Sequence, residues 1–259
     1  MSLRKWQAKF WFGAVSVLPI APLLFIQGQL TRWKVGLLSG AAGETKGVAG
    51  NLVGKPAKLF VIGESTVAGL GARTHKEALA GRFAEQLSKR LDRPVEWKVV
   101  GKNGVTARRT IEELLPQMPD EKFDYILIGL GGNDVMKLSS PKKWRNDMVE
   151  LLQLIRKRQP DAPIFLSNCP MIIMSPVIPQ PIKALLWQLS QMHNANVIEF
   201  SRGMPGVYYY RQPPLVNLDG FFADGIHPSE QGYADWSEAM MKFFDENYEW
   251  QNHHKPQKI

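Results

Sequence analysis

Apolar residues follow two repeating patterns along most of the chain. Short, nearly continuous apolar stretches predict buried strands at 58–62, 95–100, 125–128, 164–166 and 196–200. Between them, apolar residues recur at three- and four-residue steps, which predicts helices at 77–91, 106–117, 141–159, 182–194 and 230–248. This regular alternation indicates a parallel sheet with helices on both faces.

The beginning of the chain has a different pattern. Residues 10–27 are uncharged and largely apolar, about the length that crosses a bilayer core as a helix. Tryptophans lie near both edges of this stretch, where such rings favour lipid headgroups: Trp6, Trp11 and Trp33. We therefore expect residues 1–38 to form an N-terminal hydrophobic helix, either a retained anchor or a signal-like segment.

Two prolines, Pro19 and Pro22, weaken a straight spanning helix, so a kinked or interfacial anchor is an alternative. Packing of this helix on the domain is another. Residues 39–56 contain five glycines, the composition of a flexible linker. A single α/β domain is expected over 57–250, followed by a polar tail at 251–259.

The net charge of +8 is not spread evenly along the chain. Residues 1–46 hold six basic residues and one acidic residue, whereas residues 47–250 hold 24 basic and 23 acidic residues. A balanced body with basic ends argues against a nucleic-acid partner and favours contact with a membrane surface. The single cysteine, Cys169, excludes an intramolecular disulfide and a cysteine-built zinc site.

Polar and glycine-rich loops follow the predicted strands. Ligands of open parallel sheets bind beyond the carboxyl ends of the strands, so these loops are the candidate site. They comprise the segments 63–66, 101–104, 129–134 and, before the last helix, 224–229.

Three of these residues can form a nucleophilic system. Ser65 lies at a strand-to-helix turn, His227 can serve as its base, and Asp224 can orient the imidazole. The N–H groups of Ser65 and Gly104 and the amide of Asn133 can stabilise an oxyanion. Because residue 104 is a glycine, it has no side chain that would obstruct the approach to the reacting oxygen.

The four blocks, in this order, resemble the SGNH (GDSL-type) hydrolase family of serine esterases and lipases. The resemblance covers roughly 57–244. It implies a flavodoxin-like three-layer α/β/α sandwich with a parallel five-stranded sheet. It also implies that Ser65, Asp224 and His227 are the catalytic triad, and that Ser65, Gly104 and Asn133 form the oxyanion hole.

One position departs from the family pattern, because Glu64 stands where the family usually has Asp. The departure bears on the hydrogen bonding of this turn and not on the nucleophile. The α/β-hydrolase alternative requires a G-x-S-x-G elbow, and position 67 is valine. We expect Asp134 to be structural, His193 to be a core or surface residue, and Cys169 to be a small buried side chain.

The segment after the fourth strand suggests a substrate class. Met171, Ile172 and Met174 are expected to line an apolar wall for an acyl chain, with packing on the next helix as the alternative. Together with the N-terminal segment, this favours a small-molecule or lipid ester as substrate. The alternatives are an O-acetyl deacetylase of cell-envelope carbohydrate, a non-catalytic membrane-tethered binding module, and an acyltransferase.

The expected chemistry needs no cofactor and no metal. Membrane association through the N-terminal segment is expected, with the periplasmic or extracytoplasmic side slightly favoured.

Overall fold

The chain folds around one six-stranded sheet with the order β1-β3-β2-β4-β5-β6. This computed structural model describes residues 3–36, 38–51, 53–169, 171–211, 218–248 and 250. Strands β2 to β6 are parallel, and β1 joins the edge antiparallel to β3. The strands are β1 (Lys46–Ala49), β2 (Ala57–Gly63), β3 (Val95–Gly101), β4 (Tyr125–Gly129), β5 (Ile164–Leu166) and β6 (Val207–Tyr209).

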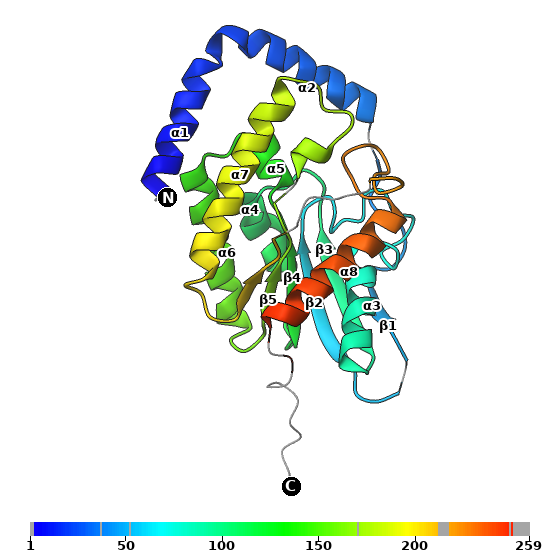
Figure 1. Cartoon of the computed structure of the whole chain (residues 1–259). Coiled ribbons are helices and arrows are strands. Elements are labelled where there is room, and N and C mark those ends of the chain that lie inside the picture. Colours follow the sequence, from blue (N-terminus) through cyan, green and yellow to red (C-terminus); the bar gives the residue numbers. More distant parts are fainter. Residues whose placement is uncertain are drawn as a thin grey trace.

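Helices cover both faces of the sheet (Figure 1). On β2, Leu59 and Val61 pack under α3 (Leu79–Leu91) and α8 (Glu230–Asn247). Phe60 and Ile62 point to the opposite face, under α6 (Pro141–Arg158) and α7 (Ile182–Ser201). Successive side chains of a strand alternate between faces, so a strand that is apolar throughout requires both helical layers. The three-layer sandwich predicted from the pattern is confirmed.

The fifth parallel strand lies elsewhere than predicted. The stretch 196–200 is not a strand but the last part of α7, with Asn196, Val197 and Phe200 buried along one side. The parallel strand is instead the three-residue β6. The sheet also has six strands rather than five, because the antiparallel β1 was missed.

The predicted helix at 106–117 is irregular. It consists of a single turn, α4 (Ala107–Arg109), a π-helical turn, η2 (Thr110–Leu114), and a 3-10 turn, η3 (Leu115–Gln117). Pro116 has no N–H to donate, so the regular bonding pattern cannot continue through it.

The glycine-rich stretch 39–56 differs from the expected linker. It contains β1, and the Ala41 N–H donates to the Ala68 carbonyl at 2.9 Å. Gly47 also lies against the Trp97 ring, where a Cβ would come within 2.5 Å. Glycine at position 47 therefore allows β1 to pack closely against Trp97 rather than making the segment flexible.

The N-terminal segment forms a bent pair of helices, α1 (Leu3–Ser16) and α2 (Ala21–Val35), joined by η1 (Leu18–Ile20). Within the described residues, no single helix is long and apolar enough to cross a bilayer; the pair reaches that length and composition only across a 47° bend. Phe10 packs against the small core beneath α7, which corresponds to the alternative of a helix packed on the domain. The predicted tail at 251–259 lies outside the described residues.

Candidate active site

The Ser65 turn begins where β2 meets β4. A Cβ on Gly63 would come within 2.0 Å of the Gly129 carbonyl oxygen, so only glycine fits this close approach. The turn that follows is held by the Leu70 N–H, which donates to the Ser65 carbonyl at 3.0 Å. Ser65 is buried and stands at the carboxyl edge of the parallel strands.

Asp224 and His227 form a bonded pair on the loop before α8. Asp224 Oδ2 lies 2.7 Å from His227 Nδ1, and Asp224 Oδ1 accepts the N–H groups of Ile226 and His227. Burial acts to raise the pKa of Asp224, but the hydrogen bonds from His227 and the backbone outweigh it and lower that pKa. An ionised Asp224 thus holds the Nδ1–H tautomer, which leaves Nε2 as the basic nitrogen.

The loop of His227 is packed against the turn of Ser65. A Cβ on Gly71 would come within 2.1 Å of the Pro228 carbonyl oxygen. The Tyr233 hydroxyl donates to the Leu70 carbonyl at 2.7 Å, and Arg73 pairs with Glu230. The two segments therefore meet at one edge of the sheet, although no hydrogen bond links the Ser65 hydroxyl to His227 among the described residues.

Gly104 lies at the next loop, with a φ of +79° that favours glycine. A Cβ there would meet nothing within 4 Å. The left-handed backbone, rather than crowding within the protein, therefore explains the glycine. In the part of the chain that the structure describes, no residue accepts a hydrogen bond from the N–H groups of Ser65 and Gly104. Both donors are therefore free to bind an oxygen of a ligand.

Glu64 has a role that the sequence did not reveal. Its carboxylate accepts the N–H groups of Gly132 and Asn133 at 2.6 and 2.7 Å, and the Asn133 side-chain amide at 2.7 Å. These N–H groups begin the short helix α5 (Gly132–Met136), where an anion is favourable. Burial nevertheless raises the pKa of Glu64 to about 7, against the effect of these donors. The longer Glu64 side chain thus still bonds the residues that begin α5.

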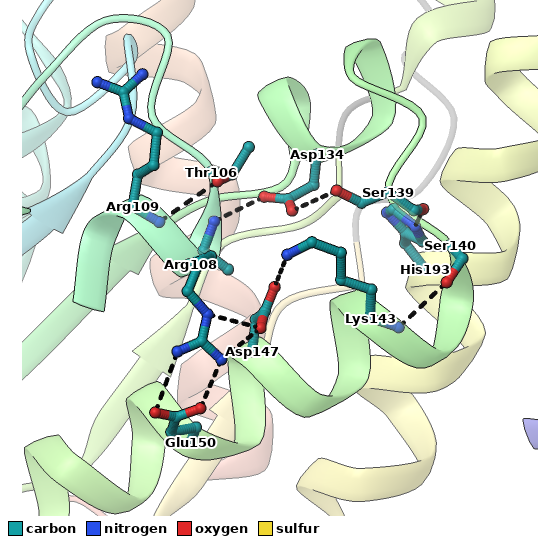
Figure 2. A network of polar contacts seen from close by, with 11 residues as sticks. Thr106, Arg108, Arg109, Asp134, Ser139, Ser140, Lys143, Asp147, Glu150 and His193 are labelled. Carbon is teal, nitrogen blue, oxygen red and sulfur yellow. Dashed lines mark hydrogen bonds and ion pairs between the residues drawn. The ribbon is translucent and has the colours of Figure 1, made fainter. Parts of the chain in front are cut away.

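A network behind the site fixes the position of α5 (Figure 2). Asp134 is fully buried and accepts the Ala107 N–H at 2.8 Å and the Ser139 hydroxyl at 3.0 Å. Burial raises the pKa of this carboxyl to about 6. Beside it, Arg108 reaches Asp147 on α6. Asp134 is thus a structural residue, as predicted.

The predicted apolar wall is only partly available. The loop at 171–181 does lie beside the Asp224 loop, because the Ser175 hydroxyl donates to the Gly225 carbonyl at 2.7 Å. Ile172, however, is buried in the small core under α7. This is the packing on the next helix that the sequence offered as the alternative, while Met171 and Met174 are half-buried.

The remaining candidate residues are structural. His193 is fully buried, stacks on Trp144 and bonds the Ser139 carbonyl, and its burial lowers its pKa to about 4. Cys169 is buried at the end of β5, and burial raises the pKa of its thiol to about 12. Within the described residues, no three His, Cys, Asp or Glu side chains are grouped to hold a metal ion.

Solved structures share this fold. A lipase from a goat rumen metagenome, Lip_vut3, has a TM-score of 0.60 and 18% identity, over 72% of this chain and 96% of its own. A carbohydrate esterase family 2 enzyme from Corynascus thermopiles (Myceliophthora fergusii) has a TM-score of 0.57 and 18% identity, over 78% and 69%. A family 3 carbohydrate esterase from Clostridium thermocellum has a TM-score of 0.53 and 16% identity, over 74% and 97%.

The fold is a flavodoxin-like sandwich, and together with the family match it defines the class, a carboxylic ester hydrolase. The model of the GDSL-like lipase/acylhydrolase family matches residues 61–234, and the chain belongs to this family. A search of curated protein sequences found no match.

Proposed function

We propose that this chain cleaves a carboxylic ester through an acyl-enzyme on Ser65, with His227 as the base and Asp224 as the orienting acid. The observation that carries the proposal is the 2.7 Å bond between Asp224 and His227, on a loop packed against the Ser65 turn. The missing bond between Ser65 and His227 is compatible with this role, because catalytic hydrogen bonds often shorten only when substrate is bound.

The reaction would follow two steps. His227 Nε2 takes the hydroxyl proton of Ser65 as the oxygen attacks the ester carbon, and it returns that proton to the leaving alcohol. Water then attacks the acyl carbon and loses its proton to His227, which returns that proton to Ser65 Oγ as the acyl–oxygen bond breaks and the carboxylic acid leaves. The developing oxyanion would be held by the N–H groups of Ser65 and Gly104 and by Asn133 Nδ2. One Nδ2 hydrogen is bonded to Glu64, which leaves the second for the substrate.

A fluorophosphonate probe tests the nucleophile directly. The wild-type chain should be labelled and should hydrolyse p-nitrophenyl acetate, whereas Ser65→Ala should do neither. Ser39→Ala, an exposed serine in the stretch before β1, is the matched control and should behave as wild type. Labelling that persists in Ser65→Ala would assign the nucleophile elsewhere. An unlabelled but folded wild-type chain would favour a non-catalytic binding module.

For the substrate, we favour a lipophilic ester at a membrane. The half-buried Met171 and Met174 beside the site and the apolar N-terminal helices support this choice. An O-acetylated carbohydrate is the second candidate, because two of the structures with this fold are carbohydrate esterases. Comparing acetyl and longer acyl p-nitrophenyl esters with acetylated glycans separates the two. A chosen alcohol acceptor added to the assay would reveal acyl transfer.

A further inference from the structure

The helices α1, η1 and α2, here called the arch, carry a large exposed apolar surface. Nine of their large apolar side chains are each at least 48% exposed: Trp11, Phe12, Val15, Leu18, Leu23, Phe25, Ile26, Leu30 and Trp33. Large apolar side chains exposed in this number mark an interaction site in a folded protein.

The charges on the arch indicate which partner covers it. Residues 3–43 contain no acidic residue, and the basic side chains are exposed near both ends of the arch: Arg4, Lys5, Lys9, Arg32 and Lys34. Aromatic and aliphatic side chains flanked by basic ones fit an anionic lipid surface. A second copy of the chain would bring the same positive charges to this surface, which disfavours self-association.

The arch lies at the same end of the molecule as the candidate active site. In Figure 1, α2 lies at the end of the molecule at which α8 begins. The Gln27 amide donates to the Gln180 carbonyl at 2.7 Å, on the loop that contacts Gly225. Beyond α2, Ala41 is bonded to Ala68, which lies in the Ser65 turn.

The contacts of the arch with the domain favour a position along a bilayer rather than across it. Gln7 accepts the Lys142 N–H at 2.9 Å, Phe10 packs against the core under α7, and Gln27 bonds Gln180. A helix that crossed the membrane would have to break these contacts. The 47° bend at Leu18–Ile20 also interrupts the span.

We infer that the arch binds along the surface of an anionic bilayer and thereby turns the carboxyl edge of the sheet toward esters held in that membrane. The binding rests on the exposed side chains and charges alone. The consequence for substrate rests on the proposed ester hydrolysis at Ser65.

Vesicle binding tests the surface independently of catalysis. The Ser65→Ala chain, which should not consume lipid, is sedimented with vesicles of phosphatidylcholine alone or with one quarter phosphatidylglycerol. It should bind the anionic vesicles more tightly, and 1 M NaCl should weaken the binding. The double variant Phe25→Glu, Trp33→Glu should bind on the order of 100-fold more weakly, because two large apolar side chains no longer enter the lipid.

The matched control is Val53→Glu, since Val53 is 75% exposed and lies before β2, at the opposite end of the strands. The Ser65→Ala chain that also carries Val53→Glu should bind vesicles as tightly as the Ser65→Ala chain does. Equal binding by the Phe25→Glu, Trp33→Glu variant, or no binding by the unmodified chain, would overturn the inference. A stable dimer in solution that the same variant dissociates would assign the surface to a second copy instead.

The orientation of the site toward the membrane is tested with chains that retain Ser65, on two substrates. Phe25→Glu, Trp33→Glu should cleave soluble p-nitrophenyl acetate at the wild-type rate but lose at least about tenfold on an ester embedded in anionic vesicles. An equal effect on both substrates, or none on the embedded ester, would overturn the orientation. Failure of Ser65 chemistry would instead abolish hydrolysis of both substrates and leave vesicle binding intact.

Discussion

Asn133 depends on Glu64 for its position. Both the backbone N–H and the side-chain amide of Asn133 donate to the same carboxylate oxygen, each at 2.7 Å. An amide held at two points loses little entropy when an oxyanion forms, and such preorganised donors contribute strongly to catalysis.

The substitution Asn133→Ala should therefore reduce kcat by about 10²–10³-fold, or roughly 3–4 kcal/mol of transition-state stabilisation. Circular dichroism and thermal unfolding should show an intact fold. Asn146→Ala, at an exposed position on α6, is the control and should leave kcat unchanged. Unchanged turnover in Asn133→Ala would remove this residue from the oxyanion hole.

Glu64 should make stability depend on pH. Because burial raises its pKa to about 7, the folded state retains a proton that the unfolded state releases at its ordinary, lower pKa. Stability should then fall as pH rises from about 4.5 toward 7, by a few kcal/mol, on the order of 3.

The measurement is Tm against pH for wild type and Glu64→Gln. The variant cannot titrate, so the difference in Tm between the two proteins should drift across this window and level off above it. Subtracting the two curves also cancels the contribution of His193, whose pKa is lowered by burial to about 4. A pH-independent difference would show that Glu64 is ionised throughout.

At the scale of elements, ion pairs link α4 to α6 in addition to the apolar core that both helices join. The side chain of Asp147 is 4% exposed and pairs with both Arg108 and Lys143, while Glu150 also pairs with Arg108 but is 45% exposed (Figure 2). The buried carboxylate of Asp147 therefore links α4 to α6, the helix on which Asp147 lies.

Asp147→Ala should lower the free energy of unfolding by about 1–3 kcal/mol, because it leaves two cations without their buried acceptor. Glu150→Ala, at the exposed end of the same network, should cost less than about 1 kcal/mol. Urea unfolding of both variants gives the comparison. Equal losses would mean that burial does not distinguish the two carboxylates.

The elements were predictable where one pattern extends over many residues, as in α6, whose buried Trp144, Leu151 and Ile155 recur at helical spacing. Short elements were not. The three residues of β6 are too few to show a period, and the apolar residues at 196–200 match a strand as well as the end of α7. The strand β1 was not predictable because its one glycine, Gly47, is required by contact with Trp97, which local sequence does not reveal.

At the scale of the whole molecule, the site joins segments that are far apart in the chain. Tyr233 on α8 reaches back to the Leu70 carbonyl, and Arg73 reaches Glu230. The first of these links is buried, whereas the Arg73 side chain is 83% exposed.

Tyr233→Phe should destabilise the fold by about 1–3 kcal/mol, because the hydroxyl is removed and the buried Leu70 carbonyl loses its donor. It should also lower kcat, since the Ser65 turn loses a link to the helix that follows His227. Arg73→Ala breaks the exposed link between the same segments and should cost less than about 1 kcal/mol. Chemical unfolding and esterase assays of both variants measure the two effects. A larger loss of stability or of kcat in Arg73→Ala than in Tyr233→Phe would contradict this ranking.

The candidate site was largely visible in the sequence because its residues follow strands, and parallel strands end at one edge. The Asp224–His227 bond lies within a single loop, so its short spacing anticipated it. The bonds of Glu64 to Asn133 and of Asp134 to Ala107 were not predictable, because they depend on how separate loops approach one another.

The short path from α2 to the Ser65 turn limits how far the enzyme can reach. Five residues lie between Val35, the end of α2, and Ala41, which is bonded to Ala68. Even fully extended, such a tether spans only about 20 Å. An arch resting on lipid would therefore keep the Ser65 turn close to the headgroups, and esters projecting far into the aqueous phase would lie out of range.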